Sequence, residues 1–277
     1  MIINRIGYDQ VLKTKTRMIK TLNQLNGLYI REIKTTFRSP AIIVLSIVQP
    51  LLWIIFFGSS FASAPRAFLE DFFHTDNYIA FLLAGQLSTS MLFVGMFSSL
   101  SLIQDKKSGY LRRIMVTPTR NHTIFLSKVL GASTRGMLQV PIVFAGVMLF
   151  GVQIPDMIGI SAFIASLFLL SLGLSSIYLF LTMKSSDWQI PTVVANFINL
   201  PLMFASTALF PNENFPTWMQ TISDLNPVSF SSTFGREIII SGNIVNADWL
   251  YFFYLLIFAI TMLLIGVIVA NKTLKID

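Results

Sequence analysis

The chain has 277 residues, of which 54% are hydrophobic and only 12% are charged. Soluble domains carry roughly 25% charged residues, so a soluble globular fold would lack enough polar surface. Lys and Arg outnumber Asp and Glu by 20 to 13, and the absence of cysteine excludes disulfides and thiolate metal sites.

Residues 1–39 are predicted to be a cytoplasmic segment that contains an amphipathic interfacial helix. Residues 1–15 show no clear period, but from Met18 to Phe37 apolar residues recur every three or four positions, with basic residues on the other faces. Such a helix next to a span normally lies among the lipid headgroups. It is either a simple surface anchor or an arm that also contacts a cytoplasmic partner. Ser39-Pro40 should end it.

Residues 40–270 are predicted to form an all-α integral membrane domain with six transmembrane helices. Six windows of at least 20 residues contain no Asp, Glu, Lys or Arg: Ser39–Pro65, Asn77–Gln104, Gly136–Pro155, Met157–Met183, Trp188–Asn212 and Trp249–Asn271. About 20 helical residues cross the hydrocarbon core, where backbone groups must be paired within the protein. We expect the spans at about 40–62, 78–103, 134–152, 158–181, 190–210 and 250–270.

Small residues within these windows indicate where helices pack closely, because lipid gives helices no hydrophobic reason to associate. The second span is rich in Ser, Thr and Gly. The fourth has Ser171, Gly173 and Ser175, and the sixth has Gly266 and Ala270 four residues apart.

The distribution of basic residues predicts the orientation. If both termini and the 105–123 loop share one side, that side holds eighteen of the twenty Lys and Arg residues. The other side keeps only Arg66 and Arg236, with eight of the thirteen acids. The positive-inside rule makes the basic side cytoplasmic, including the 271–277 tail. We therefore expect a multi-pass protein of the plasma (inner) membrane, in contact with lipids and not with nucleic acid.

Residues 211–248, between the fifth and sixth spans, do not fit a simple hairpin on the outer side. The segment is too apolar for a free loop and too short and polar to span the membrane. We favour re-entrant or interfacial half-helices, because irregular backbone at membrane depth must be buried in protein or line a cavity. The alternative is a loop packed on the surface.

No motif for chemistry is present in the sequence. It contains no GxxxxGK[ST], no HExxH and no GxSxG, and no span holds a carboxylate pair. We therefore expect no enzyme activity and no cofactor or metal in this chain. Because the spans also lack groups that a proton or sodium gradient would use, transport would take its energy from another polypeptide.

The 105–123 loop, "DKKSGYLRRIMVTPTRNHT", has the pattern of a short amphipathic helix. Ser108 can cap it, Leu111, Ile114 and Met115 fall on one face, and Thr117-Pro118 should stop it. Such a helix could dock on a soluble partner. On these residues alone, a simple positively charged topogenic loop explains the pattern equally well.

This stretch resembles the first cytoplasmic loop of the permease subunits of type-2 ATP-binding-cassette (ABC) exporters. That loop has Gly-x-Leu-x-Arg, then Thr-Pro, then a Lys about ten residues later. The corresponding residues here are Gly109, Leu111, Arg113, Thr117, Pro118 and Lys128. The family usually has glutamates where this chain has Lys106, Lys107 and Arg112.

A second stretch, "LFPNENFPTWMQTISDLNPVSFSSTFGREIIISG", resembles the same family's outer signature. Its matching residues are Phe210-Pro211, Pro216, Trp218, Leu225-Asn226-Pro227, Arg236 and Gly242. "REIKTTFRSPAIIVLSIVQPLLWIIFFG" likewise looks like the family's amphipathic arm and first span. The likeness covers nearly the whole chain after about residue 20, and it is nearest to the daunorubicin-type drug-resistance and polysaccharide-export permeases.

The resemblance implies a unit of two six-span permeases, either two copies or a copy and a paralogue, with two cytoplasmic ABC ATPases that bind ATP and Mg. It implies that Gly109–Pro118 is a coupling helix, with Leu111, Ile114 and Met115 as the apolar contact to the ATPase and Arg113 as a polar one. Export of a lipid-like, drug-like or glycan substrate would follow. The rival interpretations are a scaffold or sensor that shares the fold, an unaided channel or carrier, and a membrane enzyme.

Two further positions bear on the substrate pathway. Thr192, Asn196 and Asn199 are spaced i, i+4, i+7, so they share one face of the fifth span. They could hydrogen-bond within one permease or face a cleft between two, and we favour the cleft. Arg135, near the start of the third span, is expected to extend toward the headgroups rather than to bind substrate.

Overall fold

The computed structural model describes residues 2–38, 40–61, 64–75, 77–152, 155–245 and 247–273, and these residues form helices and turns without a strand. The helices are α1 (Ile2–Phe37), α2 (Pro40–Phe61), α3 (Arg66–Phe73), α4 (Tyr78–Lys107), α5 (Tyr110–Met115), α6 (Asn121–Met148), α7 (Met157–Thr182), α8 (Gln189–Phe204), α9 (Thr217–Ser223), α10 (Pro227–Ser241) and α11 (Trp249–Thr273). The prediction of an all-α fold is confirmed.

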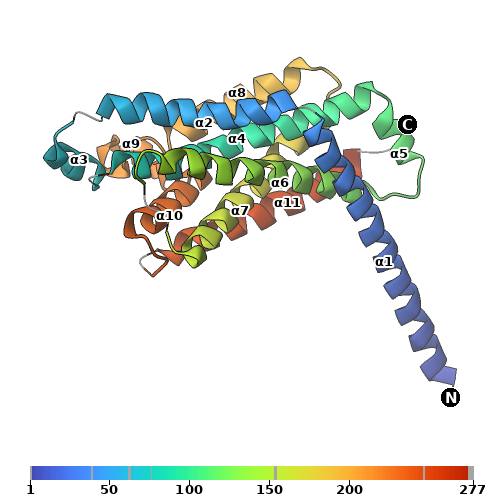
Figure 1. Cartoon of the computed structure of the whole chain (residues 1–277). Helices are drawn as coiled ribbons and strands as arrows, with labels where there is room; N and C mark the ends of the chain where they lie inside the picture. The colour runs from blue at the N-terminus through green and yellow to red at the C-terminus, as the bar shows by residue number, and fades with distance from the viewer. Residues whose placement is uncertain are drawn as a thin grey trace.

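The bundle has two distinct ends (Figure 1). The short helices α3, α9 and α10 gather at one end, and α5 lies at the opposite end together with the end of α11. This separation matches the sequence, because α3, α9 and α10 come from the acidic segments and α5 from the basic loop. The loop predicted to be cytoplasmic and the segment predicted to be outer therefore lie at opposite ends.

Four described helices, α2, α4, α7 and α11, are long and apolar enough to cross a membrane. α8 is apolar but has only 16 residues. α6 has 28 residues, but Lys128, Arg135 and Gln139 make it less apolar. The helices thus lie at all six expected places, and the count of six spans remains a prediction.

Three boundaries differ from those expected. α1 begins at Ile2 rather than near Met18, since no proline interrupts the chain before Pro40. It still ends at Phe37, and α2 begins at Pro40; Ser39 lies outside the described residues. α6 begins at Asn121 rather than at 134, because the polar lead-in also winds into the helix. α8 ends at Phe204 rather than at 210.

α4 is the central helix, and its hydrophobic residues are buried on every side, as in a helix that lies inside a bundle. It packs against α2, α6, α7 and α10. In contrast, α2, α8 and α11 expose large apolar side chains such as Phe56, Phe197 and Ile257, which are 65%, 82% and 62% exposed. These outer faces have the character of lipid-facing or partner-facing surfaces.

The small residues lie at close contacts, as predicted. A Cβ on Gly173 of α7 would meet the ring of Phe258 of α11 at 2.3 Å, and one on Gly266 of α11 would meet the ring of Phe125 of α6 at 2.1 Å. Ala270 is fully buried. The contact with the least room joins Gly85 of α4 to the turn after α8, where a Cβ would lie 1.9 Å from the carbonyl oxygen of Ala208.

Gly85→Ala should therefore lower the free energy of unfolding by about 1–3 kcal/mol, because the backbone of α4 and of the turn after α8 must move to admit the methyl group. The measurement is the thermal unfolding temperature of the purified full chain in one detergent. Gly27→Ala is the matched control, since a Cβ at this helical glycine meets nothing within 4 Å. Unfolding of Gly85→Ala at the wild-type temperature would contradict this packing.

Candidate functional site

The short helix predicted in the 105–123 loop is present as α5, with a start that differs by one residue from the expected one. Ser108 caps the end of α4 rather than the start of α5. Gly109 is the N-cap residue of α5 and has φ of 69°, the left-handed region that glycine enters without strain. After Met115 the chain turns, and the Thr117 hydroxyl donates to the carbonyl of Ile114 at 2.6 Å. The helix thus ends before Pro118, as predicted.

The apolar face of α5 points into the bundle, which corrects the expectation that it faces the ATPase. Leu111 is only 4% exposed and belongs to a buried cluster that includes Leu102, Phe125 and Leu179 of α4, α6 and α7. Ile114 and Met115 are half-buried against the same cluster. The physical reason is that these side chains can bury apolar surface on the protein itself. Arg112, Arg113 and Val116 are the side chains that face outward.

A buried ionic cluster, Arg31–Glu32–Asp105–Lys128, ties α1 and α6 to the end of α4 beside α5. Asp105 is 5% exposed and accepts a hydrogen bond from Arg31 at 2.7 Å and one from Lys128 at 2.6 Å. Glu32 accepts from Arg31 at 2.8 Å and from Lys128 at 3.2 Å. The Arg31 guanidinium lies 3.6 Å above the ring centre of Tyr110, the first residue of α5.

The cluster explains the lysine of the loop signature, and it involves three residues outside the matched positions, Arg31, Glu32 and Asp105. Lys128 is 4% exposed, and a buried cation is stable only when it is paired. Removing one partner from such a cluster typically costs about 3–5 kcal/mol, because the remaining charges stay buried. The position of α5 therefore depends on Arg31 and Asp105.

Lys106, which stands where the family usually has a glutamate, has a different role. Its ammonium donates to the carbonyl oxygens of Met183 and Ser185, just after the end of α7. A cation there satisfies carbonyls that have no partner within the helix. The neighbouring Lys107 lies 5.4 Å from the ring centre of Trp188, between α7 and α8.

At the opposite end, Asn226 of the second signature joins two helices. Its side-chain oxygen accepts from the backbone N–H of Val228 at 2.9 Å and caps the start of α10. Its amide nitrogen donates to the carbonyls of Leu202 and Ala205, at 2.8 and 2.7 Å, at the end of α8. Pro227 occupies the first position of α10, where its missing N–H costs nothing.

Arg236 of α10 also binds the turn that follows α8. It donates to the carbonyl of Thr207 at 2.6 Å, and its guanidinium lies 3.5 Å from the ring centre of Phe81 of α4. The Thr207 hydroxyl is also within 3.0 Å of the hydroxyl of Thr233. Of the remaining signature residues, Pro216 precedes α9 as its N-cap residue, and Trp218 is 66% exposed on α9.

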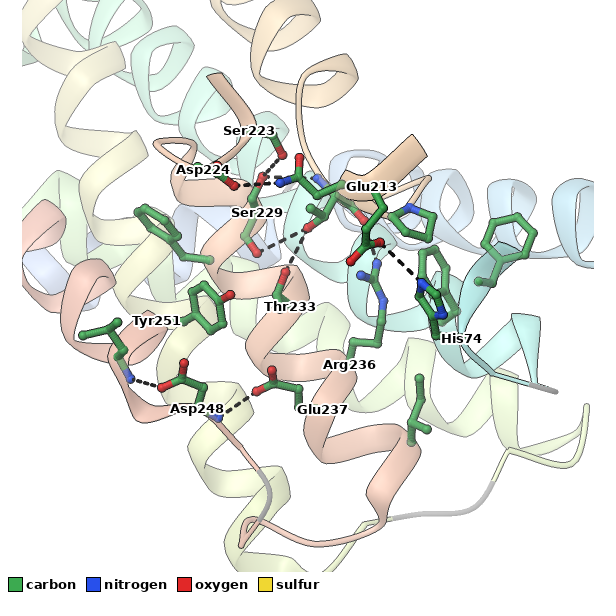
Figure 2. Close-up of a pocket in the computed structure, with 18 of the residues that line it drawn as sticks. His74, Glu213, Ser223, Asp224, Ser229, Thr233, Arg236, Glu237, Asp248 and Tyr251 are labelled. Carbon is green, nitrogen blue, oxygen red and sulfur yellow. Dashed lines mark hydrogen bonds and ion pairs between the residues drawn. The ribbon is translucent and has the colours of Figure 1, made fainter. Parts of the chain in front are cut away.

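A cavity of about 650 Å³ opens between α3, α10, the start of α11 and the segments on either side of α9 (Figure 2). Arg236 lines it, and His74 lies 3.4 Å from Glu213 on the same wall. Glu237 and Asp248 lie together on another wall, where the backbone N–H of Asp248 donates to the carboxylate of Glu237 at 2.7 Å. Burial raises the pKa of Glu237, although that hydrogen bond and Arg236 oppose the shift. Four acids line this cavity, so it is mainly acidic.

The predicted pathway residues do not share one environment. Asn199 is 6% exposed and accepts a hydrogen bond from the hydroxyl of Tyr178 of α7. It therefore does not face outward, because Tyr178 fills the space beside it. Thr192 and Asn196, nearer the start of α8, are exposed. Within the described residues, no group of three His, Asp or Glu side chains is placed to hold a metal.

Substitutions at Asn226 should separate its two tasks. Asn226→Ser keeps an N-cap acceptor but is too short to bridge both carbonyls of α8, whereas Asn226→Ala loses the cap as well. The cap alone is worth about 1 kcal/mol, and each buried carbonyl left without a donor costs about 1–3 kcal/mol. We expect both variants to unfold at lower temperature than wild type, with Asn226→Ala the lower. Wild-type stability of Asn226→Ser would show that the bonds to α8 contribute nothing.

Comparisons with known proteins identify the family of this chain. Residues 23–240 match the sequence pattern of the ABC-2 type transporter family. The putative transport permease ycf38 of Cyanophora paradoxa is 33% identical over 197 residues, which cover 70% of this chain and 66% of that protein. Its counterpart in Pyropia yezoensis is 27% identical over 247 residues, covering 88% of this chain and 84% of that protein.

The daunorubicin resistance ABC transporter permease protein DrrB1 of Streptomyces coeruleorubidus is 24% identical over 198 residues, which cover 71% of this chain and 66% of that protein. The family match includes α5, the ionic cluster and most of α10. This chain therefore belongs to the ABC-2 type transporter family, whose permeases are the membrane subunits of ABC transporters and not their ATPases.

Proposed function

We propose that this chain is the transmembrane permease of an ATP-driven exporter that moves a lipid-like, drug-like or glycan substrate out of the cytoplasm or inner leaflet. The daunorubicin-resistance relative supports a drug-like cargo. ATP and Mg would be bound by a separate ATPase subunit, since this chain has no P-loop sequence.

The observation that carries the proposal is the attachment of α5 to the helical bundle. Its apolar side is fixed to α4, α6 and α7, and Tyr110 at its start contacts the buried ionic cluster. Its outward side chains include two arginines, Arg112 and Arg113. A helix held in this manner moves with the bundle, so a partner that binds its basic face would move the spans.

The complete transporter would contain two permeases, a second copy or a paralogue, and two ATPases. Exposed apolar side chains on α2 and α8, including Phe56 and Phe197, provide faces for lipid or for the second permease. In this arrangement Thr192 and Asn196 would face the substrate pathway. The basic α5 end would lie in the cytoplasm with both termini, and α9 and α10 would form the outer, re-entrant segment.

The direct test is ATP hydrolysis by the co-purified complex in liposomes. We expect an ABC ATPase to purify with this chain and its hydrolysis rate to rise when a transported lipid, drug or glycan is added. If no ATPase purifies with the chain, or if none of these substrates stimulates hydrolysis, a non-transporting scaffold or sensor would explain the fold better.

Charge reversal on α5 should uncouple the two subunits. Arg112→Glu together with Arg113→Glu should lower substrate-stimulated hydrolysis at least about tenfold, since each lost charge-assisted contact costs about 1.5–3 kcal/mol. Membrane insertion and thermal stability should be unchanged, because both side chains are exposed. Arg38→Glu, an exposed arginine after α1, is the control. Leu111→Asp is a poor test, because burial of a carboxylate there would unfold the site.

A further inference from the structure

A second cleft, of about 170 Å³, lies between α1, α4 and α6 beside the ionic cluster. Arg135, Lys128, Gln104 and Glu32 line it together with Phe97 and Trp188. Arg135 lies two helical turns after Lys128 on α6, about 10 Å farther from the start of the helix at Asn121. The cleft thus reaches from the α5 end of the bundle into its side.

The charges around this cleft do not balance. Both carboxylates, Glu32 and Asp105, are already engaged by Arg31 and Lys128. The other oxygen of Glu32 accepts from the hydroxyl of Ser101 at 3.2 Å. Three cations therefore face two acids, and the charge of Arg135 is the one left over.

Arg135 is half-buried, yet its guanidinium has no hydrogen bond or ion pair with any described residue. Its nearest described interaction is with the ring of Phe97, whose centre is 5.7 Å away. Glu32 acts on it only electrostatically across the cleft. A guanidinium has five N–H donors, and unpaired donors away from bulk water are costly. Arg135 therefore needs an acceptor that the described chain does not supply.

The chemistry of the cleft selects an anion with several oxygens. A guanidinium binds phosphate through two parallel hydrogen bonds, and the amide of Gln104, also without a described partner, can donate a third. Trp188, 42% exposed at the cleft, is the side chain that favours the headgroup level of a bilayer. Basic pockets between membrane helices bind anionic headgroups for the same reasons.

We propose that this cleft binds the phosphate of an anionic glycerophospholipid, with Arg135 as its principal ligand and Gln104 as an additional donor. The acyl chains would lie outside the cleft, in the bilayer. This replaces the expectation that Arg135 extends to free headgroups with a defined site. The proposal does not rest on the export function, because binding requires neither the ATPase nor transport.

The test is native mass spectrometry of the purified full chain in detergent with equal amounts of phosphatidylglycerol and phosphatidylcholine. Wild type should retain phosphatidylglycerol preferentially. Arg135→Gln should reduce that preference about tenfold, which corresponds to the loss of a bidentate charged contact. Arg135→Lys should keep part of it, because the charge remains but the paired geometry is lost.

Arg120→Gln, an exposed arginine immediately before α6 and outside the cleft, is the matched control and should retain the wild-type preference. Should Arg135→Gln fail to fold, Gln104→Leu tests the same cleft from an exposed position and should lower the amount of phosphatidylglycerol retained, without loss of stability. An unchanged preference in the Arg135 variant, or unchanged retention of phosphatidylglycerol in Gln104→Leu if that replaces it, would overturn the proposal. An equal loss in Arg120→Gln would do the same.

Soluble competitors distinguish the two sources of phosphate. Inorganic phosphate and glycerol 1-phosphate, added in excess, should leave phosphatidylglycerol bound, because they lack the acyl chains. If either displaces the lipid, the cleft is a site for free phosphate and the lipid assignment is wrong. Because the assay contains no ATPase, its outcome is separate from the hydrolysis test of export.

Discussion

The carboxylate of Asp105 is the constraint on which the α5 end of the molecule depends. It lies at the last turn of the central helix and is bound by a cation from α1 and another from α6. Three helices are thereby held at one buried point beside α5. Burial of charges is expensive, so the arrangement persists only with all its partners in place. The cluster therefore fixes the relative positions of α1, α4 and α6 more than it adds to the free energy of unfolding.

The other end is held together by hydrogen bonds to backbone. Asn226 and Arg236 bind carbonyl oxygens at the end of α8 and in the turn that follows it. Gly85 lets α4 approach that turn closely. The two ends are therefore stabilised differently: by paired charges where the sequence is basic, and by side-chain hydrogen bonds to backbone carbonyls where the backbone is irregular.

The sequence predicted the helices well because charge-free windows are a strong signal, and it identified both signatures. It placed α5 correctly, but not the direction of its face, since Leu111 can bury itself on this chain or on a partner with the same pattern. Neither could it pair Arg31 with Asp105, which lie 74 positions apart. The environment of Asn199 was missed because helical spacing says nothing of Tyr178 on another helix.

One consequence of the cluster concerns how motion of α1 is transmitted to the bundle. α1 is anchored at Arg31, but it continues as one helix back to Ile2 and extends away from the bundle (Figure 1). Gln24 also donates to the carbonyl of Pro118 at 3.3 Å. At 1.5 Å per residue, the stretch from Ile2 to Lys20 is about 27 Å long. A small rotation at the pivot becomes a large displacement at the tip, and a modest force on the tip becomes a large torque on α4. Because Gln24 bonds Pro118 and Arg31 lies over Tyr110, a displacement of α1 also reaches the α5 loop.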